Sequence, residues 1–80
     1  MNLTVLYFAR FREAVGREQE PLTGDFTTLG SVREHLLALG GHDVLGERNL
    51  MCARNETLCT LNEPVEEGDI VAFFPTVTGG

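Results

Sequence analysis

The chain has 80 residues, of which 42% are hydrophobic, and its formal net charge is −6. This length allows one small domain with one compact core and leaves no room for a deep enclosed active site. No apolar run approaches the roughly 20 residues of a membrane span, and six arginines scattered among twelve acids exclude the basic face of a nucleic-acid binder and suit a basic protein partner.

The first half of the chain predicts two strands separated by a short helix. Residues 3–10 form a strand with apolar residues on both alternating faces, which is typical of a central strand. Residues 11–15 predict a short helix that Gly16 ends. A weaker strand follows over residues 17–23, and Gly24 with Asp25 predicts a turn.

The next segment carries the one long helical pattern, over residues 29–39. Its apolar stripe consists of Leu29, Val32, Leu36 and Leu39. Thr28 is the preferred N-cap, while Ser31 followed by Glu34 is an alternative capping box that would start the helix later. Gly40 and Gly41 end the helix in either case.

The second half predicts a hairpin and a last strand. After a polar loop over residues 42–49, the segments 50–54 and 57–61 pair about Asn55 and Glu56. This pairing places Cys52 opposite Cys59. Residues 66–69 predict a solvated turn, and residues 70–74 form the last strand.

These elements predict an α+β fold, a mixed sheet of about five strands with one main helix across one face. The first and last strands are the most apolar, so they could lie side by side in parallel. We expect the domain to cover residues 1–74 and residues 75–80 to form a flexible tail.

One helix covers only one face of such a sheet, which leaves the other face open. We expect the helix-facing set to be Leu3, Val5, Tyr7, Val71 and Phe73. The set that faces away then forms an exposed apolar patch, made of Leu6, Phe8, Ile70, Ala72 and Phe74. Such patches mark protein interfaces. The alternatives are that loops cover the patch, or that the register is shifted by one residue, which would exchange the two faces.

The C-terminal Gly79-Gly80 pair is the candidate chemical group. Two glycines without Cβ atoms make a thin thread, and residues 75–80 reach roughly 20 Å when extended. The carboxylate of Gly80 could be activated as an acyl-adenylate, and a sulfur nucleophile could then convert it to a thiocarboxylate. A functionless chain end is the alternative, and Gly-Gly alone does not exclude it.

The other candidate residues predict no catalytic or metal site. Cys52, Cys59, His35 and His42 lack the spacing of zinc ligands. His35 is expected on the solvent side of the helix and His42 in a loop. The two cysteines fit small sheet residues and a reducing cytoplasm better than a disulfide scaffold.

Two stretches resemble a known family. LYFARFRE over residues 6–13 and GDIVAFFPTVTGG over residues 68–80 resemble the small, sulfur-carrier subunits of molybdopterin synthases, which are ubiquitin-like β-grasp proteins. The resemblance runs over the full chain, although Arg54 stands where the family more often has an apolar residue.

The resemblance implies that Gly80 is adenylated by an E1-like enzyme that uses ATP, with Gly79 as its slim approach. A sulfur donor protein then yields the thiocarboxylate. The inserted tail would be Pro75, Thr76, Val77 and Thr78, and Phe8 and Phe74 would lie in the interface with the large catalytic subunit.

In that subunit, within a two-plus-two heterotetramer, sulfur would pass to cyclic pyranopterin monophosphate. The small subunit itself would be non-catalytic and would hold no permanent cofactor. Three alternatives remain: a sulfur carrier for thiamine thiazole synthesis, a ubiquitin-like protein modifier, and an interaction domain that does not need Gly80.

Overall fold

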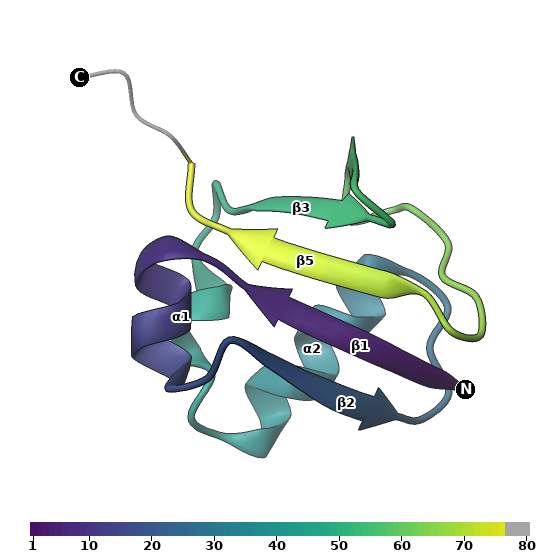
Figure 1. Cartoon of the computed structure of the whole chain (residues 1–80), viewed down its shortest axis with the longest axis horizontal. Coiled ribbons are helices and arrows are strands. Elements are labelled where there is room, and N and C mark those ends of the chain that lie inside the picture. Colours follow the sequence, from purple (N-terminus) through teal and green to yellow (C-terminus); the bar gives the residue numbers. More distant parts are fainter. Residues whose placement is uncertain (77–80) are drawn as a thin grey trace.

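The computed structural model describes residues 1–76, in which five strands, two α-helices and one 3-10 helix form a single sheet with helices beside it (Figure 1). In chain order they are β1 (Asn2–Tyr7), α1 (Ala9–Val15), β2 (Gln19–Thr23), α2 (Leu29–Leu39), the 3-10 helix η1 (Asp43–Gly46), β3 (Met51–Arg54), β4 (Thr57–Cys59) and β5 (Ile70–Phe74). Neither α-helix of this described part has the length and apolar character to cross a membrane.

The sheet has the order β2-β1-β5-β3-β4. β1 and β5 run parallel at its centre, with Val5 opposite Val71, and all other neighbours are antiparallel. The prediction that the first and last strands pair in parallel is therefore confirmed. The hairpin is confirmed too, because Cys52 lies opposite Cys59 across β3 and β4.

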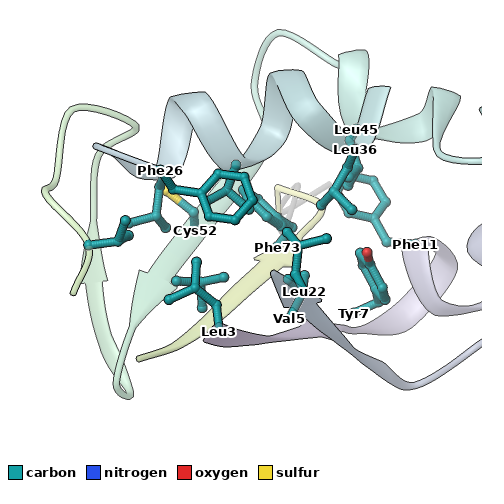
Figure 2. Packing of buried hydrophobic residues seen from close by; sticks show 14 residues of the cluster. Leu3, Val5, Tyr7, Phe11, Leu22, Phe26, Leu36, Leu45, Cys52 and Phe73 are labelled. Atoms are coloured by element: carbon teal, nitrogen blue, oxygen red, sulfur yellow. The ribbon is translucent and has the colours of Figure 1, made fainter. Parts of the chain in front are cut away.

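The core fills the space between the sheet and α2 (Figure 2). Every residue of the predicted helix-facing set is buried, with relative exposures between 0% and 3%. From α2, the stripe residues Leu29, Val32 and Leu36 are fully buried. Leu39 is not, since 58% of it is exposed, so this part of the prediction is wrong. It lies in the last turn, just before the chain leaves the helix at Gly40 with φ 87°.

The start of α2 is fixed by reciprocal capping. The Thr28 hydroxyl accepts a hydrogen bond from the Ser31 backbone N–H at 3.2 Å, and the Ser31 hydroxyl accepts one from the Thr28 N–H at 3.1 Å. Thr28 is therefore the N-cap, as predicted. Ser31 takes part as the third helical residue, so the alternative later start is wrong.

Several element boundaries differ from the predictions, most of all the end of β1. β1 ends at Tyr7 rather than at residue 10, because Ala9 adopts φ 53° and turns the chain directly into α1. That helix then ends at Gly16 (φ 89°), as predicted. The loop over residues 42–49 is not wholly polar, because Leu45 in η1 is fully buried.

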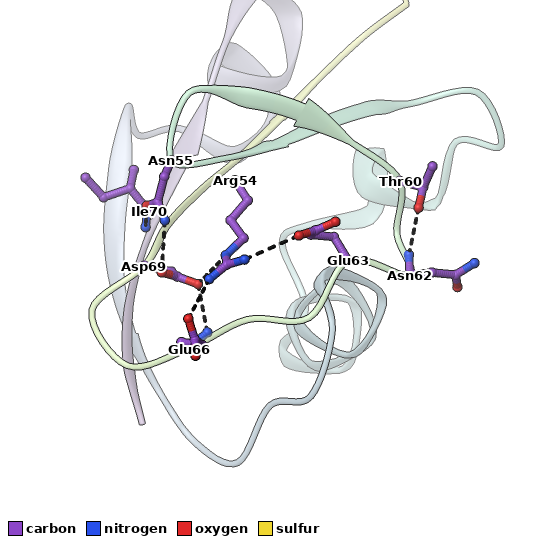
Figure 3. A network of polar contacts seen from close by, with 8 residues as sticks. All are labelled: Arg54, Asn55, Thr60, Asn62, Glu63, Glu66, Asp69 and Ile70. Atoms are coloured by element: carbon purple, nitrogen blue, oxygen red, sulfur yellow. Dashed lines mark hydrogen bonds and ion pairs between the residues drawn. The ribbon is translucent and has the colours of Figure 1, made fainter.

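The turn over residues 66–69 is not simply solvated, because Asp69 is only 7% exposed. Its carboxylate accepts hydrogen bonds from Arg54 Nε at 2.7 Å, from Asn55 Nδ2 at 3.0 Å and from the Glu66 N–H at 2.7 Å (Figure 3). Burial opposes ionisation, but these bonds outweigh it and hold the pKa of Asp69 below its usual value. The charged Arg54 thus joins the hairpin to this turn and also pairs with Glu63 and Glu66.

Candidate functional site

The parallel pairing of β1 and β5 brings the carboxyl ends of both strands to one edge of the sheet (Figure 1). Phe8 follows the last residue of β1, and Phe74 is the last residue of β5. Their rings meet edge to face, with centroids 6.2 Å apart and an interplanar angle of 81°. Two residues that are far apart in the sequence thus form one aromatic pair, and 45% of Phe8 remains exposed.

An apolar hollow of about 370 Å³ opens beside this pair. It is lined by Phe8, Ala9, Phe74 and Pro75, which we call the docking edge. The positive φ of Ala9 is uncommon for a residue with a Cβ and costs roughly 1–3 kcal/mol. Phe8, the residue before this turn, lies after the end of β1 and is the N-cap of α1.

The sheet face opposite α2 carries further apolar side chains, which we call the open face. Pairing places Leu6, Ala72 and Ala53 in one row across three strands. Around this row, Ile70 is 44% exposed and Leu58 on β4 is 62% exposed. Of the predicted patch, Phe8 and Ile70 are exposed, and the shifted register is excluded because the helix-facing set is buried.

The prediction of an exposed patch is wrong for Ala72 and holds only in part for Leu6 and Phe74. Ala72 is only 7% exposed, because its short side chain lies in a central strand, between side chains of the neighbouring strands β1 and β3. Leu6 and Phe74 are intermediate in exposure. The most exposed apolar surface therefore lies at Phe8 and toward Ile70 and Leu58, rather than in the middle of the sheet.

The tail begins directly at the docking edge. Pro75 follows the end of β5 and lines the hollow. The Thr76 hydroxyl then donates a hydrogen bond to the backbone carbonyl of Asn49, the residue shortly before β3. The remaining tail residues of the prediction, Val77, Thr78, Gly79 and Gly80, lie outside the described residues.

The cysteines and the other possible metal ligands are further candidate site residues of the described domain. Over residues 1–76, no three His, Cys, Asp or Glu side chains gather to hold a metal ion. Burial raises the pKa of the Cys52 thiol to about 12 and also raises the pKa of Cys59. The Cys52 thiol donates to the Cys59 carbonyl at 3.3 Å. Both thiols therefore stay protonated at neutral pH. The two cysteines lie in the hairpin as small sheet residues, as predicted.

A buried polar cluster around Glu20 was not predicted from the sequence. Glu20 is 8% exposed and accepts a hydrogen bond from the Tyr7 hydroxyl at 2.6 Å. His42 Nε2 lies 2.8 Å from the same carboxylate oxygen. The available signal was the alternation of β2, which places Glu20 on the same face as the buried Leu22.

A five-stranded mixed sheet with one main helix across it is the β-grasp fold of ubiquitin-like proteins, and here the docking edge lies where the C-terminal tail begins. The model of the ThiS family matches residues 5–80. The chain belongs to this family.

Two relatives and one solved structure illustrate the relationship. The chain is 45% identical to the molybdopterin synthase sulfur carrier subunit of Haemophilus influenzae and 40% identical to that of Escherichia coli K12, in each case over 98% of this chain and 99% of the relative. Its structure is similar to a chain in the complex of subunits 1 and 2 of the molybdopterin-converting factor from Helicobacter pylori. That match has a TM-score of 0.70, 27% identity and full coverage of both chains.

Proposed function

We propose that this chain is the sulfur-carrier subunit of a molybdopterin synthase and that the carboxylate of Gly80 is the carrier group. The observation that carries the proposal is the position of the exposed apolar docking edge at the root of the tail that ends in Gly79 and Gly80. A partner that covers Phe8 and Phe74 also receives the tail. The relatives at 40% and 45% identity carry the same function in their names.

The chemistry takes place on Gly80 in three steps. First, its carboxylate attacks the α-phosphate of ATP in an E1-like enzyme, which releases pyrophosphate and leaves an acyl-adenylate. A persulfide on a sulfur donor protein then attacks the acyl carbon and AMP departs, which leaves an acyl disulfide. A thiol attacks the donor-side sulfur of this S–S bond, so that a new disulfide forms on the donor and Gly80 leaves as the thiocarboxylate. Finally, in the large catalytic subunit, the thiocarboxylate sulfur displaces an oxygen substituent from a side-chain carbon of cyclic pyranopterin monophosphate. Water then cleaves the acyl–sulfur bond, which leaves the sulfur on the pterin and restores the carboxylate of Gly80, and a second carrier supplies the second sulfur.

This scheme requires no catalytic group from the described domain, in agreement with its protonated thiols. ATP is a substrate of the activating enzyme rather than a resident cofactor. The domain contributes recognition: the docking edge holds the partner, and the tail, with Gly79 next to the reacting carboxylate, enters its active site. We place the assembly in the cytoplasm, as a heterotetramer with two copies of each subunit.

The intact mass of the chain tests the proposal after incubation with ATP, the cognate E1-like enzyme and a sulfur donor. We expect one oxygen to be replaced by sulfur, and we expect a variant that lacks Gly80 to remain unchanged. An unchanged wild-type mass, with the enzyme shown active by pyrophosphate release on a known carrier, contradicts the proposal. Addition of the large subunit and cyclic pyranopterin monophosphate then separates molybdopterin synthesis from supply to thiamine thiazole synthesis.

A further inference from the structure

Residues 42–49 connect the buried polar cluster to the root of the tail. At the start of this segment His42 contacts Glu20 of β2. Further along, Glu47 forms an ion pair with Arg10 of α1. At its end the Asn49 carbonyl accepts the hydrogen bond of Thr76. Between these ends, the fully buried Leu45 and the hydrogen bond from Arg33 Nε to the Leu45 carbonyl at 2.6 Å also hold the segment. His42 therefore fixes the start of the segment, before Leu45.

Both ring nitrogens of His42 face groups that accept hydrogen bonds. Nδ1 lies 2.9 Å from the Gly40 carbonyl oxygen, and Nε2 lies 2.8 Å from Glu20 Oε2. A carbonyl oxygen only accepts, and so does an ionised carboxylate. A neutral imidazole has one N–H, whereas the imidazolium has two. Only the protonated ring makes both bonds.

The surroundings keep Glu20 ionised. Burial opposes its charge, but hydrogen bonds from Tyr7 and His42 outweigh this effect and hold the pKa of Glu20 below its usual value. Tyr7 in turn has its pKa raised by burial and by its bond to Glu20, so its hydroxyl remains a donor. Arg17 lies 3.4 Å from the other carboxylate oxygen, and Asp43 follows His42 in the chain.

We propose that His42 and Glu20 form a proton-dependent latch, closed by the imidazolium, which holds the start of this segment against β2. Without the second ring proton one of the two hydrogen bonds is lost, and the chain between Gly40 and Leu45 opens more often. Tyr7 and Arg17 still satisfy Glu20, so the fold persists. The latch stands without the proposed function.

Backbone amide exchange of the isolated full chain tests the latch at pH 5.5 and at pH 8. We compare protection factors, which are corrected for the intrinsic effect of pH on exchange. For the Leu45 amide, which donates to the His42 carbonyl at 3.0 Å, we expect protection to fall about two- to tenfold at the higher pH, the equivalent of one lost hydrogen bond. In His42→Gln, whose amide donates without titrating, we expect the fall to disappear.

His35→Gln is the matched control, because His35 is exposed on α2 and packs edgewise on Phe26 rather than in the cluster. It is expected to retain the wild-type profile. Glu20→Gln supplies a second test should His42→Gln fold poorly, since it removes the charge that faces the imidazolium and should shrink the fall. A wild-type profile without any fall, or an equal fall in every folded variant, overturns the latch. No partner enters this measurement, so it is independent of the mass test for Gly80.

Discussion

Truncation of Phe8 to alanine tests whether the docking edge binds the large subunit. About 45% of this side chain is exposed in the free protein, and a phenylalanine buries roughly 200 Å² when it is fully covered. A partner that covers the exposed part therefore removes about 90 Å² of apolar surface from water. At about 25 cal/mol per Å² this contributes about 2 kcal/mol, or roughly a thirtyfold increase in Kd when the ring is removed.

Titration calorimetry with the cognate large subunit measures this change. Leu39→Ala is the matched control, because Leu39 is 58% exposed at the end of α2, away from the docking edge. It should bind as the wild type does. Circular dichroism and thermal unfolding confirm that both variants are folded. An unchanged Kd for Phe8→Ala, or an equal loss for Leu39→Ala, refutes the assignment of the interface to this edge.

Two further predictions concern stability. The pKa of Asp69 is lowered in the folded chain, so its contribution to the free energy of unfolding is present above the ordinary aspartate pKa and is lost as pH falls through the folded value. In urea denaturation, Asp69→Asn should therefore be less stable than the wild type at pH 7 and should lose less stability in acid. An unchanged acid profile would contradict this prediction. Thr28→Ala removes the acceptor for the Ser31 N–H and should lower the free energy of unfolding by about 1 kcal/mol. Thr28→Ser keeps the hydroxyl and should lower it less. Equal losses of stability in the two variants would show that the cap hydrogen bond contributes nothing.

The arrangement of the sheet could be predicted because its signals are local and repetitive. Apolar residues on both alternating faces identified β1 and β5 as central strands that could lie side by side in parallel, whereas the register that sets Val5 opposite Val71 was not predicted. The apolar stripe of α2 then predicted that one face of the sheet is covered by this helix. A short turn at Asn55 and Glu56 fixed the hairpin register.

Features that depend on contacts between distant segments could not be predicted. The burial of Asp69 requires Arg54 to reach across from the hairpin, and nothing in the acidic sequence around Asp69 reveals that partner. Glu20 lies on the inner side of an edge strand, where Tyr7, His42 and Arg17 meet its charge. The docking edge was predicted in part. Phe8 and Phe74 were predicted as interface residues, but the turn at Ala9 beside Phe8 was not.

The central position of β5 has a consequence for how the protein folds. β5 is the last element in chain order, yet it lies between β1 and β3, so the β1–β2 and β3–β4 pairs share no strand until it arrives. Pairing between such distant segments slows folding, and synthesis delivers the N-terminal segments first. The sheet of a nascent chain therefore cannot be completed until β5 has left the ribosome. Since Phe74 is the last residue of that strand, the docking edge forms in the same event as the fold, and an incomplete chain cannot present it.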